Sequence, residues 1–188
     1  MIIGLGGLAR SGKDTFFEHA FLYFKRKGIS AKRFAFADEL KKEINDTCIS
    51  LYGISAFTND EKEKEAIRPV LVAHGMIRRG SSNGLHWINK IKTKIKKNSE
   101  EGGVSIITDS RFENEIREIN SIGGKSIHIT REGNNPPNEE ERENDPKVRE
   151  LSLYKFHWKD FGNEANEYPE KMVFSFLDLA REKDKWMI

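Results

Sequence analysis

The sequence contains so little cysteine that a disulfide-stapled fold is excluded. Its 188 residues include one cysteine, Cys48, which has no second thiol to pair with and no cysteine or histidine neighbours at the spacing of a zinc site. A chain of this length buries a sizeable core without such staples. We therefore expect a single domain over residues 1–188, in a reducing, cytoplasmic environment.

Long apolar runs are also missing. Nowhere do about 18 apolar residues follow one another, the length that crosses a bilayer as a helix. The first apolar run has no basic region ahead of it and no small-residue cleavage site after it, which a secretory signal would have. We expect a protein without a membrane partner.

An excess of charge of one sign is absent too. Lysine and arginine number 32 against 30 acidic residues, so the formal net charge is only +2. The most basic run, KIKTKIKK at residues 90–97, accompanies Trp87, Ile91 and Ile95 at every fourth position, which predicts the solvated side of an amphipathic helix. Its lysines lack interleaved aromatic residues for stacking on bases. No nucleic-acid partner is expected.

What the sequence does contain is a glycine-rich turn near its start. Gly7 and Gly12 stand five positions apart in GLARSGKD, and Lys13 follows directly. This is the G-x-x-x-x-G-K part of a P-loop, a phosphate-binding turn between a strand and a helix. The β-prone run MIIGLG precedes the turn. A helical period follows it, with three residues expected on one face: Phe17, Phe21 and Phe24.

A turn of this kind is suited to bind phosphate. Backbone N–H groups and the positive end of the helix dipole converge there, and glycines allow the backbone to wrap closely around an anion. Lys13 adds a mobile positive charge for the β- and γ-phosphates. The residues predicted to bind ATP are Gly7, Arg10, Ser11, Gly12, Lys13, Asp14 and Thr15.

An aspartate stands where a P-loop normally has the serine or threonine whose hydroxyl binds Mg²⁺. Asp14 could bind the metal directly or through water, accept a hydrogen bond from an attacking group, or cap the helix. Thr15, which comes next, could supply the missing hydroxyl. Asp14 and Thr15 are therefore both candidate Mg²⁺ ligands.

Strands and helices alternate along the rest of the chain. After the first strand, the patterns predict strands at KRFAFAD (32–38), VSIITDS (104–110), KSIHITR (125–131) and YKFHWKDF (154–161). Helical patterns lie between them, and a last helix begins near Pro169. This order predicts an α/β protein in which a five-stranded, mostly parallel sheet has helices on both faces. Together with the glycine-rich turn, it resembles the three-layer fold of P-loop kinases.

Two stretches depart from this alternation. From Asp38 to Gly103 only helical patterns occur, and roughly 60 residues exceed an ordinary crossover. We predict a helical substrate-binding insertion at about 39–103, with residues 1–38 and 104–188 as the core. Residues 132–150 are rich in proline, asparagine and glutamate and are expected to form a mobile or disordered loop. We predict that residues of about 131–150 act as a lid.

Asp109 ends an apolar strand, in TDSRFENE. An acidic residue there would suit a Walker B position, which organises Mg²⁺ and its waters, although capping of the strand end is the simpler alternative. Arg111, two positions on, could reach a phosphate or form a salt bridge. We predict Asp109 as a metal ligand and, with Lys13 and Arg111, as a catalytic residue.

Four segments of this chain resemble the phage deoxynucleoside monophosphate kinases, P-loop kinases in which aspartate regularly follows the P-loop lysine. They are ARSGKDT, FADELK, TDSRFENE and IHITR, and the element order is similar over nearly the whole chain. The resemblance implies a kinase that uses ATP and Mg²⁺ to phosphorylate a deoxynucleoside monophosphate, as a monomer or homodimer. If phage-encoded, it would act in the host cytoplasm.

The resemblance also implies which residues bind the acceptor. Asp38 and Lys41 would stand at the mouth of the monophosphate site, unless they pair with each other across one helical turn. In residues 68–87, the matching positions are Arg68, Gly75, Arg78 or Arg79, and Trp87. Arginine suits a monophosphate because its planar fork bonds two oxygens at once. Solvated cations at a helix end are the alternative for Arg78 and Arg79.

Two arginines of the expected lid complete the predicted site. The resemblance implies that Arg131, the last residue of KSIHITR, faces the transferred phosphoryl group. Arg142 is a further candidate for substrate binding, with charge pairing inside the loop as its alternative.

Other functions stay open at this point. Animal phosphomevalonate kinases have a similar SGKD, so a kinase for another small phosphate, such as phosphomevalonate or dephospho-coenzyme A, is one alternative. A non-catalytic nucleotide-binding module, or an ATPase coupled to nucleic acid, is the other. No further nucleic-acid motif accompanies the loop, which gives the second alternative little support.

Overall fold

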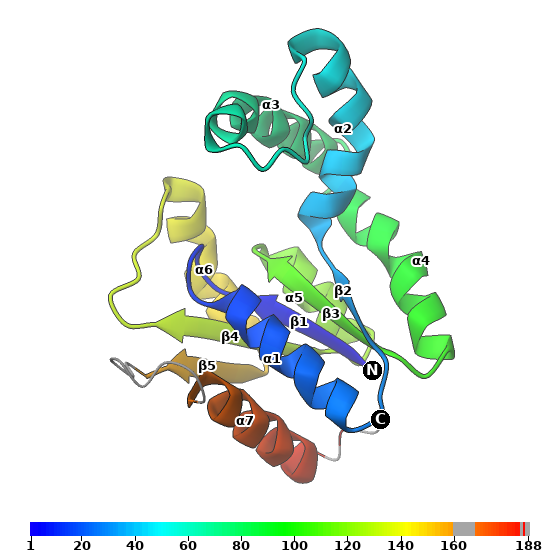
Figure 1. Ribbon diagram of the computed structural model, residues 1–188, viewed down its shortest axis with the longest axis vertical. Helices are drawn as coiled ribbons and strands as arrows, with labels where there is room; N and C mark the ends of the chain where they lie inside the picture. Colours follow the sequence, from blue (N-terminus) through cyan, green and yellow to red (C-terminus); the bar gives the residue numbers. More distant parts are fainter. Residues whose placement is uncertain (160–167, 185, 187–188) are drawn as a thin grey trace. The chain divides into compact units, whose positions relative to one another are not determined.

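Five parallel strands form one sheet in the computed structural model, which describes residues 1–159, 168–184 and 186 (Figure 1). The strand order is β2-β3-β1-β4-β5. The strands are β1 (Ile2–Gly6), β2 (Ala31–Phe34), β3 (Val104–Ser110), β4 (Lys125–Arg131) and β5 (Tyr154–Trp158). The predicted α/β class is confirmed, and every strand pair in this sheet is parallel.

The helices and strands belong to two compact units. Unit 1 comprises Met1–Phe34 and Ile95–Ile188, and unit 2 comprises Ala35–Lys94. The helices are α1 (Lys13–Arg26), α2 (Phe36–Tyr52), α3 (Glu61–Gly80), α4 (His86–Glu100), α5 (Glu113–Ser121), α6 (Glu139–Leu151) and α7 (Tyr168–Asp184). Unit 1 holds the whole sheet, whereas unit 2 holds α2, α3 and the first part of α4.

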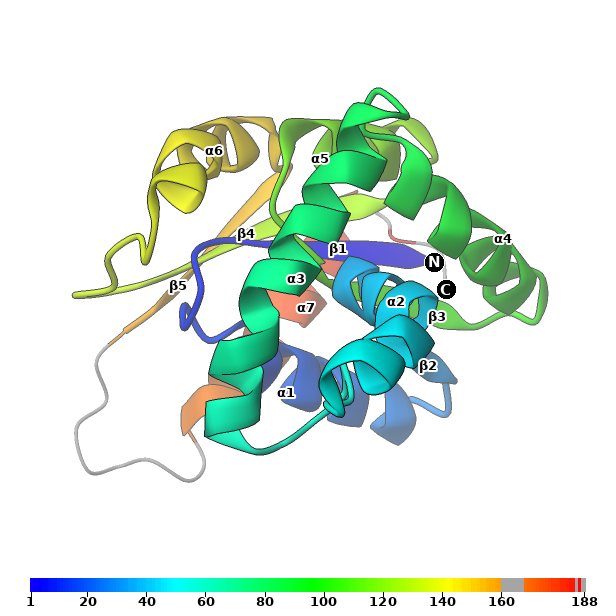
Figure 2. The ribbon, with the colours of Figure 1, turned by 90° about the horizontal axis from the view of Figure 1, so that it is seen from above.

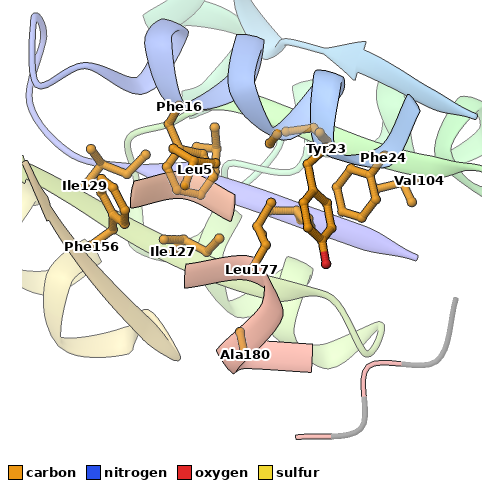
Figure 3. Close-up of a cluster of buried hydrophobic side chains, with 14 of the residues drawn as sticks. Leu5, Phe16, Tyr23, Phe24, Val104, Ile127, Ile129, Phe156, Leu177 and Ala180 are labelled. Atoms are coloured by element: carbon orange, nitrogen blue, oxygen red, sulfur yellow. The ribbon is translucent and has the colours of Figure 1, made fainter. Parts of the chain in front are cut away.

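Helices cover both faces of the unit 1 sheet (Figure 2). α1 and α7 pack together on one face, and α5 and α6 pack together on the other. Between the first pair and the sheet lies an apolar core (Figure 3), whose fully buried members include Leu5, Phe16, Ile127, Ile129 and Leu177. The ring of Phe16 meets that of Phe156 edge to face, with centroids 5.0 Å apart. The prediction of helices on both faces is confirmed.

Small residues on the central strand let the second helical layer approach closely. A Cβ atom added at Gly4 would lie 2.5 Å from Ile119 Cδ1 of α5. One added at Gly6 would lie 2.7 Å from Val148 Cγ1 of α6. Both distances are far below van der Waals contact, so these two glycines fix how near α5 and α6 stand to β1.

α1 packs apolar side chains against the core of unit 1. The buried apolar residues of α1 are Phe16, Ala20, Tyr23 and Phe24. Phe21 is 40% exposed and meets the ring of Phe17 at a centroid distance of 6.0 Å. The helix begins at Lys13, directly after the turn, and this start turns Phe16 rather than Phe17 toward the sheet. The contact between the Phe17 and Phe21 rings agrees with the shared face that their spacing predicted.

The second strand is shorter than predicted. β2 ends at Phe34, because the residues from Phe36 onward form α2 instead of continuing the strand. Asp38 and Glu39 lie in the first turn of that helix, where negative side chains interact favourably with the helix dipole. At the other edge of the sheet, β5 ends at Trp158, and residues 160 and 161 of the predicted last strand lie outside the described residues.

The loop expected after β4 contains a helix. Residues 139–151 form α6, so the prediction of a mobile or disordered segment is wrong for this part. The side chain of Asn138 accepts a hydrogen bond from the Glu141 N–H, and three glutamates fill the first turn, which stabilises a helix N-terminus. Pro146 lies inside the helix, yet Val148 beyond it is buried. Capping and burial outweigh the polar composition here.

Unit 2 has a small apolar core of its own, formed by Ile44, Cys48, Ala56 and Ile67. On α4, Trp87 and Ile91 are buried, which confirms the amphipathic pattern predicted for the basic run. Among the helices of the described residues, none combines the length and apolar character that a membrane span requires.

Candidate functional site

The turn between β1 and α1 has the backbone conformation that its glycines predicted. Gly7 and Gly12 have φ angles of 125° and 87°, in the region that side chains disfavour. A Cβ at Gly7 would lie 2.2 Å from the Ile129 carbonyl oxygen, and one at Gly12 would lie 2.4 Å from Trp158 Nε1. The turn therefore packs closely against residues of β4 and β5, and larger side chains cannot replace either glycine without displacing them.

The ammonium group of Lys13 is held inside this turn. Its Nζ donates hydrogen bonds to the carbonyl oxygens of Gly7 at 2.8 Å and Leu8 at 2.5 Å, and the residue is 7% exposed. Burial lowers the pKa of Lys13 to about 8, with a further contribution from the nearby charge of Arg111. At pH 7 the group is still mostly protonated. The turn thus concentrates a positive charge at the start of α1.

The candidate metal ligands lie at the same edge of the sheet. Asp14 and Thr15 are exposed in the first turn of α1. Asp109 is half-buried near the carboxyl end of β3, the strand next to β1, where Ser110 is in register with Gly6. Carboxylate and hydroxyl oxygens suit Mg²⁺, which usually keeps several waters and binds one or two carboxylates together with substrate phosphates. These residues fit an ion that arrives with a triphosphate.

Arg111 contacts the turn through Glu141 of α6. Arg111 NH1 donates to Glu141 Oε1 at 2.9 Å, and the N–H of Ala9 donates to Glu141 Oε2 at 2.6 Å. The Asn134 side chain donates to the Ala9 carbonyl oxygen at 3.0 Å. The salt-bridge alternative for Arg111 is therefore observed, and its partner carboxylate is also bound to the phosphate turn.

A small pocket opens beside the turn. Its lining includes Gly7, Leu8, Arg111, Glu141 and Asp145. Asp145 Oδ1 lies 2.9 Å from Nε2 of His128, a residue of β4 that is 1% exposed. Arg111 and the two acidic residues thus surround the Lys13 end of the turn with charges of both signs.

The remaining arginines predicted in unit 1 are exposed. Arg10 lies in the turn with φ 62°, a left-handed conformation that is unusual for a residue with a side chain. Arg131 is the last residue of β4. Arg142 lies in α6 and pairs with Glu139 at 3.2 Å, with both side chains about two-thirds exposed, as the charge-pairing alternative anticipated.

Apart from Arg142 of α6, the residues predicted to bind the acceptor lie in unit 2. Arg68 is exposed on α3, and a Cβ at Gly75 would lie 2.8 Å from Leu40 Cδ1 of α2. The Lys41 ammonium lies over the ring of Phe57, 5.8 Å from its centroid. The others are Asp38, which is half-buried in the first turn of α2; Arg78 and Arg79, in the last turn of α3; and Trp87, which is 2% exposed in α4.

Glu43 of α2 contacts four basic side chains of α3 and α4. Its carboxylate contacts His74 at 3.1 Å and His86 at 2.9 Å, and it also pairs with Arg78 and Lys90. Burial alone would raise the pKa of Glu43, but the hydrogen bonds from Lys90 and the other donors outweigh burial and lower it to about 2. Arg78 is thus oriented through its Nε by a carboxylate that stays ionised.

Sequence reasoning missed three residues of these clusters: Glu43, Asn134 and Glu141. Glu141 stands in a run of acidic residues, where composition indicated a solvated loop. The spacing of Glu141, Asp145 and Val148 matches one helical face, and this was the signal that could have singled out Glu141. Nothing in the sequence distinguishes Glu43 from the other glutamates of α2.

Two solved kinase structures are similar to this chain. A shikimate kinase from Aquifex aeolicus has a TM-score of 0.48 and 16% identity, with 100% of each chain covered. A sugar kinase from a Janibacter species has a TM-score of 0.43 and 11% identity, with 96% of each chain covered. No protein-family model matches the sequence, and no curated protein matches it either.

Proposed function

We propose that this protein is an ATP-dependent kinase that transfers the γ-phosphoryl group of ATP to a deoxynucleoside monophosphate. The observation that carries the proposal is the turn Gly7–Gly12, in which two glycines with positive φ hold the backbone around the buried Lys13 ammonium at the N-terminus of α1. Glycine-rich turns that end in lysine at a helix N-terminus bind the phosphates of nucleotides. The choice of a deoxynucleoside monophosphate as the acceptor rests on the sequence resemblance.

Unit 1 carries the donor side of this proposal. The turn would bind the β- and γ-phosphates through its backbone N–H groups, and Lys13 would turn from the loop carbonyl oxygens to the phosphate oxygens. Arg111 lies close enough to Lys13 to lower its pKa, so both cations are available to stabilise the charge of the transferred phosphoryl group. Arg131, together with the lid role of about 131–150, belongs to the same proposal.

Mg²⁺ is implied by this chemistry, and Asp14, Thr15 and Asp109 are the residues that would hold it. The ion, when bound, offsets charge on the β- and γ-phosphates. The exposed side chains of Asp14 and Thr15 and the half-buried Asp109 are oxygen donors, the type that Mg²⁺ prefers.

Unit 2 carries the acceptor side. The residues of unit 2 proposed to bind the monophosphate are Asp38, Lys41, Arg68, Gly75, Arg78, Arg79 and Trp87, and Arg142 of unit 1 is a further candidate. The phosphate of the acceptor is itself the nucleophile and is already ionised at neutral pH, so phosphoryl transfer needs positioning more than a strong base. Arg78 supports this proposal, because Glu43 fixes its guanidinium through Nε at one place on α3.

The proposal is tested by measuring ADP formation from Mg·ATP with a panel of acceptors. The panel contains each deoxynucleoside and ribonucleoside monophosphate, phosphomevalonate, dephospho-coenzyme A and single-stranded DNA. We expect at least one deoxynucleoside monophosphate to stimulate ADP formation and to appear as its diphosphate. The Lys13→Ala variant serves as the matched control, since it removes the charge from the turn and should abolish the stimulated rate.

Other outcomes would contradict the proposal. If no monophosphate stimulates ADP formation but phosphomevalonate or dephospho-coenzyme A does, the protein is a kinase with another acceptor. If only DNA stimulates ATP turnover, the protein is an ATPase coupled to nucleic acid. A stimulated rate that persists in the Lys13→Ala variant would show that the activity does not belong to this turn.

A further inference from the structure

We propose that Glu141 is a positioning residue for phosphoryl transfer, an inference that rests on the proposed function. Glu141 lies in the first turn of α6 and is 6% exposed. One of its carboxylate oxygens accepts from the Ala9 N–H in the phosphate turn, and the other accepts from Arg111 NH1. A single side chain therefore connects α6, the turn and the arginine that stands beside Lys13.

The carboxylate of Glu141 is itself held in place by the fold. Its own backbone N–H donates to the Asn138 side chain at 2.9 Å, which fixes the first turn of α6. One turn further on, Asp145 contacts His128 of β4, and after another turn Val148 packs on Gly6. The same face of α6 thus contacts the rest of unit 1 at three successive helical turns. The position of the Glu141 carboxylate follows from this docking and not from its side chain alone.

Glu141 holds the Arg111 side chain at this place. Its side chain is 44% exposed, and the positive charge of Lys13 is close enough to interact with it. Two cations side by side repel each other, and a long exposed arginine would swing toward solvent. The charge-assisted hydrogen bond to Glu141 offsets this repulsion and keeps the guanidinium at the pocket beside the turn.

The contact with Ala9 serves the shape of the turn. The Ala9 N–H is held by Glu141 and its carbonyl oxygen by Asn134, so both polar groups of this peptide are fixed by side chains. The next residue, Arg10, has φ 62°. Left-handed conformations of residues with side chains persist where the surrounding contacts impose them. Glu141 therefore acts on the turn and on Arg111 together.

The test is a double-mutant cycle on the kinase reaction. We compare the wild-type chain with Glu141→Ala, Arg111→Ala and the double variant, with Glu140→Ala as the matched control, because Glu140 is an exposed glutamate in the same helical turn. A misplaced catalytic group costs about tenfold to a hundredfold in rate. We expect Glu141→Ala to lower kcat by about tenfold or more in the wild-type background, and by a clearly smaller factor once Arg111 is absent, when only the contact with Ala9 is lost.

A purely structural role predicts another pattern. Glu141→Ala would then lower Tm while the folded fraction kept its kcat, or it would lower kcat equally with and without Arg111; either result overturns the proposal. If the alanine variant does not fold, Glu141→Gln replaces it, because the amide keeps the size but can accept from only one of the two donors. A kcat for Glu141→Gln equal to that of the wild type would also overturn the proposal.

A calorimetric arm separates this proposal from the proposed function. If the wild-type chain phosphorylates no acceptor, the proposed function fails, and Mg·ATP binding is measured by titration calorimetry with the same set of variants. Weaker binding in Glu141→Ala that is not additive with Arg111→Ala supports positioning by Glu141. Binding by Glu141→Ala that equals the wild-type affinity overturns it.

Discussion

Unit 1 has a large apolar core, whereas unit 2 combines a small apolar core with ion pairs between its helices. In unit 1 a continuous core joins α1, the sheet and α7, and aromatic rings such as Phe16 and Phe156 interlock within it. In unit 2 the buried cluster is small, and Glu43 and Glu39 instead bind cations from α3 and α4. We therefore expect truncation of a core side chain to destabilise unit 1 most, and acid to destabilise unit 2 most.

The largest effect on stability is expected in the unit 1 core. Phe16→Ala removes a fully buried ring at the centre of the cluster and should cost about 4 kcal/mol of unfolding free energy. Urea denaturation measures the loss. Phe21→Ala is the control, because Phe21 is 40% exposed on the same helix and should cost less than about 1 kcal/mol. Equal losses at the two positions would contradict the buried face described for α1.

Catalysis should be separable from this stability at Lys13. Lys13→Ala removes the charge inside the turn and should lower kcat by about a hundredfold or more, about 3 kcal/mol in the transition state. Circular dichroism should show an unchanged fold, since the core of unit 1 is untouched. Lys25→Ala, an exposed lysine in the last turn of α1, should keep the wild-type rate. Near-normal turnover of Lys13→Ala would remove it from the reaction.

Unit 2 should be weakened by neutralising one carboxylate. Glu43→Gln leaves its cationic partners without a counter-charge and should cost about 2 kcal/mol. Hydrogen exchange should accelerate in α2 and α3, while β1 and β3 keep their protection. Glu61→Gln on α3 is the control, because its side chain is 86% exposed. Uniform loss across both units would contradict the separate stabilisation of unit 2.

The same residue predicts an acid response. The pKa of Glu43 falls from its ordinary value of 4.5 to about 2 in the folded protein. Its contribution to stability is therefore fully present above pH 4.5 and is lost as the pH falls toward 2. The protection of amides in α2 and α3, corrected for their intrinsic exchange rates, should fall over this window in the wild type, and the fall should be smaller in Glu43→Gln. An acid response that is the same in both proteins would contradict the assignment to Glu43.

The smallest effect concerns substrate binding in unit 2. Arg68→Ala should raise the KM of the acceptor by about tenfold, about 1.4 kcal/mol, and leave the KM of ATP unchanged. Lys62→Ala, an exposed lysine near the start of α3, should change neither constant. A change in the KM of ATP alone would place Arg68 on the donor side. It would contradict the proposal that unit 1 binds ATP and unit 2 binds the acceptor.

The sequence was most informative where a local pattern decides the structure. VSIITDS and KSIHITR form β3 and β4 over the predicted residues, because buried apolar runs between turns have few other solutions. Gly7 and Gly12 have the positive φ angles that the motif requires. Both predictions rested on features contained within a few neighbouring residues.

The sequence was least informative where contacts between residues far apart in the chain determine the structure. Composition alone indicated a loop at residues 139–150, but the docking of Val148 on Gly6 favours a helix there. The partners of Glu141 and Glu43 are supplied by other elements: Glu141 and Arg111 lie 30 residues apart in the sequence, and Glu43 and Arg78 lie 35 residues apart. No periodicity within one segment carries such information.

Pro146 gives α6 a mechanical asymmetry. Proline has no N–H, so the helix lacks the bond that would join this residue to the Arg142 carbonyl, one turn earlier. The segment before it bears Glu141, whereas the segment after it is anchored by Val148 under the sheet. The two halves are consequently coupled less tightly than in an unbroken helix. The missing bond lowers the free-energy cost of bending α6 between Glu141 and Val148.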